Sequence, residues 1–187
     1  WLVIYVTEVG DLEIFKYIYQ NGGNTLIKKY DWEEPVDWVV LFETAIKFNR
    51  LNIMEYIYDN SGEHERDNSL LERIDFETGI TGNIEIIRWI VNKAKERQMD
   101  MAWFLKDMLE TSVMAGHLDN IKYLVENGAD VNSIEIITDN IDIIKYLVDN
   151  GANKEYILET NNEIDINMFK YLFEQLDTIT DQFVRGL

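Results

Sequence analysis

One phrase of sequence recurs along the whole 187-residue chain, and this internal repeat constrains the fold more than any other feature. Its clearest copies are GHLDNIKYLVENGAD at Gly116–Asp130 and NIDIIKYLVDNGAN at Asn140–Asn153. Every copy has one aromatic residue near its middle, which we call the anchor, and the six anchors are Tyr17, Tyr56, Trp89, Tyr123, Tyr146 and Tyr171. Successive anchors are 39, 33, 34, 23 and 25 residues apart. A period near 33 residues predicts an array of stacked supersecondary repeats.

The repeated phrase has the spacing of an amphipathic helix. Leu118, Ile121 and Leu124 follow one another at three-residue intervals, which places them on one helical face. Gly128 and Gly151 come directly after the last turn, where a residue with positive φ ends a helix at low cost. A second helical stretch precedes several copies, at Asp37–Lys47, Ser69–Glu77 and Met101–Met114. We therefore expect each repeat to be a pair of antiparallel helices that buries its apolar faces by stacking on its neighbours.

With these residues, above all Gly116–Asn132 and the GAN of Gly151–Asn153, the chain resembles the ankyrin repeat family. The likeness is to the divergent, Ile- and Asn-rich ankyrin repeat proteins of giant amoeba-infecting viruses. It covers essentially the whole chain and is carried by the second helix of each repeat, because the family's Thr-Pro-Leu-His opening is absent. The resemblance implies an all-α, ankyrin-like helix-pair solenoid of about six repeats.

The expected repeats form a single domain, either complete or a fragment of a longer array. Their approximate limits are 1–34, 35–67, 68–99, 100–132, 133–153 and 154–187. Only Ser133–Asn140 separates the fourth phrase from Ile141, so the last two repeats are short. We expect shortened loops there, with the projecting fingers lost and the helices joined by short turns. Terminal repeats need a polar outer face, so apolar Trp1, Leu2 and Ile4 suggest further repeats or a partner at that end.

Composition narrows the function classes. The chain has 35 acidic and 17 basic residues, a formal net charge of −18, so we expect no direct binding of nucleic acid or of an anionic membrane. With no Cys, thiolate metal sites, disulfides and Cys nucleophiles are excluded. No phosphate-binding loop or other enzyme motif occurs, so we expect no enzyme, no cofactor and no metal site. Residues 99–187 contain 17 acidic and 6 basic residues, which marks them either as the landing surface for a basic partner or as a solvated face that aids solubility.

A row of glutamates is the most specific candidate site. Glu43, Glu77 and Glu110 stand at spacings of 34 and 33 residues, each followed by Thr and a small residue. One interpretation is an acidic ladder on the concave face that binds Lys or Arg of a partner. The other is that each carboxylate accepts hydrogen bonds from loop backbone N–H groups and so holds the stack together, because buried polar groups are nearly always satisfied internally.

Tryptophans supply the second candidate. Trp32, with Glu33 and Glu34, lies between the first two repeats and is either an exposed anchor for a partner or folded back onto the first helix pair. Trp103 has helical spacing to Leu109 and is expected in the core.

The resemblance implies a non-enzymatic protein–protein interaction module, an adaptor or scaffold. We expect its concave face and loops to bind a protein partner that is basic. The alternative is a structural subunit that self-associates through apolar solenoid ends, or coats a viral particle or filament. We expect a cytoplasmic location, in the host cytoplasm or in the virion if the chain is viral.

Overall fold

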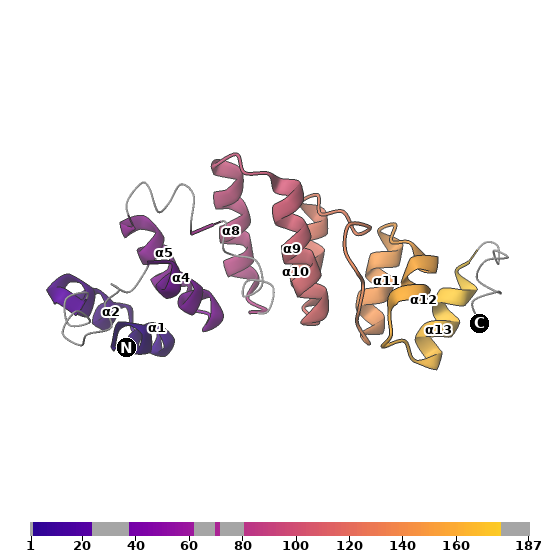
Figure 1. The fold of residues 1–187 in the computed structure, drawn as a ribbon, viewed down its shortest axis with the longest axis horizontal. Coiled ribbons are helices and arrows are strands. Elements are labelled where there is room, and N and C mark those ends of the chain that lie inside the picture. Colours follow the sequence, from indigo (N-terminus) through magenta and orange to yellow (C-terminus); the bar gives the residue numbers. More distant parts are fainter. Residues whose placement is uncertain (1, 24–37, 62–69, 72–80, 177–187) are drawn as a thin grey trace. The chain divides into compact units, whose positions relative to one another are not determined.

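The computed structural model describes residues 2–23, 38–61, 70–71 and 81–176 (Figure 1). These described residues form helices joined by turns and irregular segments, and no strand occurs among them. The all-α prediction is therefore confirmed for this part of the chain. No described helix combines the length and the apolar character that a membrane span requires. The chain divides into two compact units, residues 1–101 and 102–187, and each is described by itself.

The first compact unit packs its helices as neighbouring pairs. In chain order it contains α1 (Leu2–Val9), α2 (Leu12–Ile18), the π-type turn η1 (Tyr19–Gly23), α4 (Trp38–Lys47), α5 (Leu51–Asn60) and α8 (Ile84–Glu96). Helix α1 contacts α2 and α4, and α4 contacts α5. The core between them includes Phe15, Phe42 and Ile53, which are fully buried. The predicted helix Asp37–Lys47 is confirmed as α4, whereas Ser69–Glu77 lies almost wholly outside the described residues.

The second compact unit holds the last three copies of the phrase. Its helices are α9 (Met101–Met114, whose first residue belongs to the first unit), α10 (Leu118–Glu126), α11 (Ile141–Asp149), α12 (Lys154–Thr160) and α13 (Ile166–Glu174). Helix α9 has the bounds that the sequence predicts. Helix α10 contacts α11, and α12 contacts α13. Leu124, Ile144 and Leu172, from three different helices, are fully buried in this unit.

Four second helices, α2, α8, α11 and α13, begin at polar caps. A side-chain oxygen of each capping residue accepts a hydrogen bond from a backbone N–H of the first turn, which satisfies a donor that has no partner inside the helix. The caps of this kind are Asp11, Asn83, Asn140 and Asp165. In three repeats a glycine with positive φ, Gly10, Gly82 or Gly116, stands two residues before the second helix, and Asn49 takes that place before α5 with φ 58°. This turn reverses the chain between the two helices of a repeat.

The second helices also end in a repeated way. An asparagine four residues after the anchor donates its side-chain amide to the anchor's backbone carbonyl, at 2.7–2.8 Å. The four asparagines are Asn21, Asn60, Asn127 and Asn150. Each bond satisfies one of the last carbonyls of its helix. The same bond at the same position in four copies shows that the phrase encodes one local structure.

The fifth repeat differs from the prediction. Residues 127–140 form turns and an irregular segment with no helix, so this repeat lacks its first helix and α10 is not joined to α11 by a short turn. Ile134, Ile136 and Thr138 are nevertheless buried, because apolar side chains of the extended chain cover the core that a helix would cover. Between α11 and α12 the short connection is present, and it consists of Asn150–Asn153.

Candidate protein-binding groove

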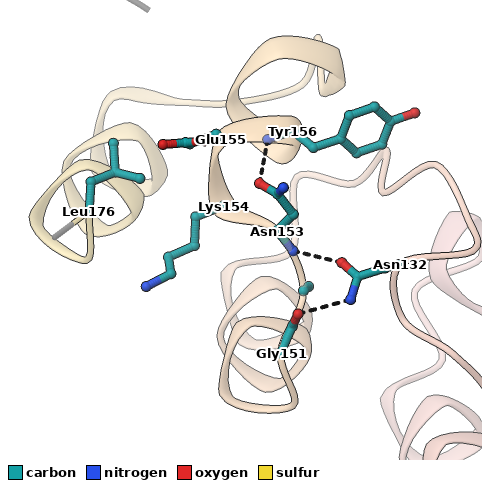
Figure 2. Close-up of a pocket in the computed structure, with 8 residues that line it drawn as sticks. Asn132, Gly151, Asn153, Lys154, Glu155, Tyr156 and Leu176 are labelled. Atoms are coloured by element: carbon teal, nitrogen blue, oxygen red, sulfur yellow. Dashed lines mark hydrogen bonds between the residues drawn. The ribbon is translucent and has the colours of Figure 1, made fainter. Parts of the chain in front are cut away.

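A groove of about 690 Å³ opens in the second compact unit, where the turn after α11 meets the start of α12 and Leu176, two residues beyond the end of α13 (Figure 2). Asn132, Gly151 and Asn153 line one side of it, and Lys154, Glu155, Tyr156 and Leu176 line the rest. The volume lies within the range of ordinary ligand pockets. The lining combines polar backbone and side-chain groups with two apolar residues, Ala152 and Leu176, and one tyrosine.

Asn132 holds the loop side of the groove in place. Its side-chain amide donates to the carbonyl of Gly151 at 3.0 Å, and its side-chain oxygen accepts from the backbone N–H of Asn153 at 2.9 Å (Figure 2). Its own backbone N–H donates to the Asp130 carboxylate at 2.9 Å. These bonds join two segments about twenty residues apart along the chain, so this wall of the groove is formed before any ligand arrives.

Asn153 connects that wall to α12. Its side-chain oxygen accepts a hydrogen bond from the backbone N–H of Tyr156 at 3.0 Å, which caps the helix (Figure 2). The Tyr156 ring points away from the cap toward solvent and is 40% exposed. A tyrosine held on a capped helix turn offers a large contact area at a low entropic cost, which is typical of residues that dominate protein interfaces.

Two charged side chains stand beside each other at the start of α12. The ammonium of Lys154 donates to the backbone carbonyl of Gln175 at 2.7 Å, which ties α12 to the end of α13. The Glu155 carboxylate forms no hydrogen bond or ion pair with another residue that the structure describes. Glu155 is half-buried. Its carboxylate is thus the ionic group of the groove available to a ligand cation.

The structure places only two of the predicted site residues. Glu43 is half-buried on α4 in the first compact unit, and Glu110 is half-buried on α9 in the second. Glu77, Trp32, Glu33 and Glu34 lie outside the described residues. Whether the glutamates form a row therefore stays a prediction. None of these residues lines the groove.

The local setting of the glutamates does repeat. The threonines after Glu43 and Glu110 each donate their hydroxyl to the carbonyl four residues earlier, Thr44 to Val40 and Thr111 to Asp107. Thr160 makes the same bond to Tyr156, which puts Glu159 at the same position on α12. The Glu110 carboxylate takes part in no hydrogen bond or ion pair within the described part of the chain. The described residues therefore show no loop N–H group that donates to the Glu110 carboxylate, as the stacking interpretation would require.

The prediction that Trp103 lies in the core is wrong. The side chain is 49% exposed on α9, whereas the sequence predicted a core position. The next two residues, Phe104 and Leu105, are buried instead. Apolar residues occupy three consecutive positions here, and a helix can turn only part of such a run toward its core. The spacing of Trp103 to Leu109 does not by itself show which residues of the run face the core.

The repeat does not identify the residues of the groove. Gly151 is predicted only to end a helix, and Asn132 and Gly151–Asn153 enter the sequence argument only through the family resemblance. One sequence feature does point to the groove: the fifth repeat is short, and this brings the ends of two consecutive loops close together. A hydrogen bond between two loops has no periodic pattern, so the repeat alone does not reveal it.

No protein-family model matches the chain, and no curated protein matches its sequence.

Proposed function

We propose that this chain is a non-enzymatic protein–protein interaction module, an ankyrin-like stack of helix pairs that binds a segment of a partner protein in the groove of the second compact unit. The observation that carries the proposal is the groove itself. Its walls are fixed by hydrogen bonds between Asn132, Gly151 and Asn153, and Tyr156 stands exposed at its edge. A preformed site loses less conformational entropy on binding than a flexible one.

The repeat architecture is supported by bonds that recur at one position. The asparagine bond to the anchor carbonyl occurs in four copies, and the threonine bond beside the glutamates in three. Ankyrin-like stacking places connecting loops and first helices on one surface, and the groove is built from those two kinds of segment. The stacking of all six repeats into one solenoid belongs to this proposal.

Charge indicates the chemistry of the partner. Residues 99–187 carry 17 acidic and 6 basic side chains, and Glu155 lies in the groove itself. A partner segment with Lys or Arg is attracted over a long range, and an apolar side chain next to the cation can contact Leu176 and Tyr156. We therefore propose a basic segment with at least one apolar residue as the ligand.

A peptide selection tests this function without a known partner. A random peptide library displayed on phage is selected against the full chain, and the enriched peptides are synthesised and titrated. We expect enrichment of Lys or Arg beside apolar residues. Replacing the exposed Tyr156 (Tyr156→Ala) should weaken their binding by about tenfold or more, on the order of 1–2 kcal/mol, because it removes the largest contact.

The matched control is Tyr5→Ala, which removes an exposed tyrosine from α1 in the first compact unit. This variant should bind the selected peptides as the wild type does, and circular dichroism should show both variants folded. The proposal is wrong if no peptide is enriched, or if folded Tyr156→Ala binds the enriched peptides unchanged.

A further inference from the structure

The residue pair Asn-Gly occurs three times in the chain, each time near the end of a copy of the phrase, at Asn21–Gly22, Asn127–Gly128 and Asn150–Gly151. Asparagine is among the chemically least stable residues of a protein. Its side-chain amide is lost as ammonia when the next backbone nitrogen attacks the side-chain carbonyl carbon. Glycine has no Cβ and so leaves that nitrogen the freest access. Each pair is therefore a potential site of spontaneous deamidation.

The end of helix α11 holds both reacting groups of the pair Asn150–Gly151. The Asn150 side-chain amide donates to the Tyr146 carbonyl at 2.8 Å, and the Gly151 backbone N–H donates to the Val148 carbonyl at 3.0 Å. Asn150 is exposed, so water reaches it. The Gly151 nitrogen has to leave its hydrogen bond before it can attack, however, and the reaction therefore requires the last turn of α11 to open.

Asn132 holds the same turn from outside the helix. Its side-chain amide donates to the Gly151 carbonyl at 3.0 Å, and its side-chain oxygen accepts from the Asn153 N–H at 2.9 Å (Figure 2). An opening that moves Gly151 away from α11 has to break the first of these bonds and strain the second. Because local opening is rarer when it breaks more contacts, Asn132 slows any reaction of Asn150.

The pair Asn127–Gly128 is a matched reference at the end of α10. The Asn127 side-chain amide donates to the Tyr123 carbonyl at 2.7 Å, and the Gly128 N–H donates to the Val125 carbonyl at 3.0 Å. The two pairs also have similar neighbours in the sequence, an acidic residue before and an alanine after. Asn132 forms no hydrogen bond with Asn127 or Gly128. The two turns thus differ in the contact from Asn132.

We propose that Asn150–Gly151 is a deamidation site controlled by Asn132, and that its reaction disrupts the wall of the groove. In the open turn the Gly151 nitrogen loses its proton to water and bonds to the side-chain carbonyl carbon of Asn150. The bond from that carbon to the amide nitrogen breaks, and the amide leaves as ammonia after taking up a proton. Water then opens the cyclic imide at one of its two ring C–N bonds, which gives aspartate or isoaspartate at this position.

Both products weaken the turn. An aspartate cannot donate to the Tyr146 carbonyl, because a carboxylate only accepts hydrogen bonds. In an isoaspartate the main chain runs through the side-chain carbon, which inserts a methylene before Gly151 and moves the Gly151 carbonyl away from Asn132. Gly151 and Asn132 both line the groove, so the modification changes the shape of its wall. The inference does not rest on peptide binding in the groove, since it concerns only the covalent chain and this contact.

Incubation of the full chain at mildly alkaline pH, followed by peptide mapping with mass spectrometry, measures deamidation at each pair. In urea, Asn127 and Asn150 should react at similar rates, because only the sequence acts there. In the folded chain both reactions should be slower by about tenfold or more, since each needs a local opening. Asn132→Ala should speed the reaction at Asn150 by about threefold or more, through the loss of its hydrogen bonds, and leave the rate at Asn127 unchanged.

Circular dichroism checks that Asn132→Ala is folded. Asn132→Asp, which loses the donor to Gly151 and retains an acceptor for Asn153, is the second variant and should also speed the reaction at Asn150. The proposal is overturned if wild-type Asn150 reacts as fast in the folded chain as in urea, or if it reacts no faster in the folded variants than in the wild type. Equal acceleration at Asn127 overturns it too, because that result indicates general loosening.

The structural consequence is measured on the product itself. Ion exchange separates the modified chain, which carries one more negative charge, and NMR records its side-chain amide signals. The Asn132 amide signals should shift relative to the unmodified chain, and unchanged signals would overturn the predicted disruption of the wall. Failure of the peptide selection would leave all of these rates and signals as expected, so the two proposals are tested separately.

Discussion

Among individual residues, Asn120 departs most from the pattern of its neighbours. It lies three residues before the anchor of α10, where the other described repeats carry apolar residues. Those residues are Ile14, Ile53, Ile86, Ile143 and Met168. Asn120 is fully buried, and neither its amide nitrogen nor its amide oxygen has a hydrogen-bond partner. The hydroxyl of Ser112, on the preceding helix α9, also lacks one.

We predict that Asn120→Ile stabilises the protein. Burying an amide without partners costs free energy that an isoleucine does not, so the free energy of unfolding should rise by about 1–3 kcal/mol. Urea unfolding measures this as a higher midpoint at unchanged slope. The matched variant Ile143→Asn puts an amide at the corresponding buried position of α11 and should lose stability. A lower midpoint for Asn120→Ile would show that the asparagine is satisfied inside the fold.

Gly10 and Gly116 occupy corresponding turns with φ 91° and 76°, yet they should not tolerate alanine equally. A Cβ on Gly116 meets nothing within 4 Å, so Gly116→Ala should cost only the backbone penalty of about 1–2 kcal/mol. A Cβ on Gly10 meets the Arg50 Nε at 2.5 Å. It would displace the Arg50 guanidinium, whose Nε and Nη2 donate to the Glu8 carbonyl at 2.9 and 2.7 Å.

The expected extra cost of Gly10→Ala is about 1 kcal/mol, the net value of such hydrogen bonds. Thermal or urea unfolding of both variants, repeated in an Arg50→Ala background, forms a double-mutant cycle. In that background the two alanine substitutions should cost the same. If Gly10→Ala still costs more stability than Gly116→Ala in the Arg50→Ala background, displacement of the Arg50 guanidinium is not the cause.

At the scale of the element, the sequence predicts the second helices well. Their apolar spacing, their polar caps such as Asp165, and the asparagines after the anchors are all local signals, so one phrase is enough. The fifth repeat shows the limit. Its segment 127–140 is too short for finger and helix together, and the sequence pattern did not show that the helix is the part lost. Ile134 and Ile136 are both buried with exposed Glu135 between them, an alternation that extended chain produces and a helix does not.

The groove lies beyond local prediction for the same reason. Asn132 acts through bonds to Gly151 and Asn153, which depend on how two loops come together in space. Trp103 and its buried neighbour Phe104 are a second case, since tertiary packing selects which residue of an apolar run faces inward. The periodic sequence pattern predicts the helices, whereas the loop contacts of the groove and the burial of Phe104 depend on how the helices pack together.

Two anchor tyrosines give the helix contacts a pH dependence. Burial raises the pKa of Tyr146, with a further rise from nearby Glu126. Burial and Asp149 raise the pKa of Tyr171 in the same way. Folding thus favours the neutral phenols, so their contribution to stability is complete below the unfolded-state pKa of about 10 and is lost as the pH rises above it.

Thermal unfolding followed from about pH 8 to about pH 11 should show a melting temperature that falls on the alkaline side, where tyrosines ionise. A double variant, Tyr146→Phe with Tyr171→Phe, should fall less steeply over the same range, since it has no phenol to ionise at these contacts. An identical slope in both proteins would contradict a role for these two anchors.

At the scale of the whole molecule, the net charge of −18 keeps copies of the chain apart and attracts basic partners. We propose that such partners are recognised in the groove of the second compact unit.

The most direct test of the central claim is to locate a selected basic peptide on the chain. Backbone amide signals of the ¹⁵N-labelled protein are recorded by NMR during titration with that peptide. The account predicts that the shifted signals gather at Asn132, at Gly151–Tyr156 and at Leu176, and that Tyr156→Ala abolishes the shifts at the same peptide concentration. Shifts that gather in the first compact unit, or that persist in folded Tyr156→Ala, would contradict it.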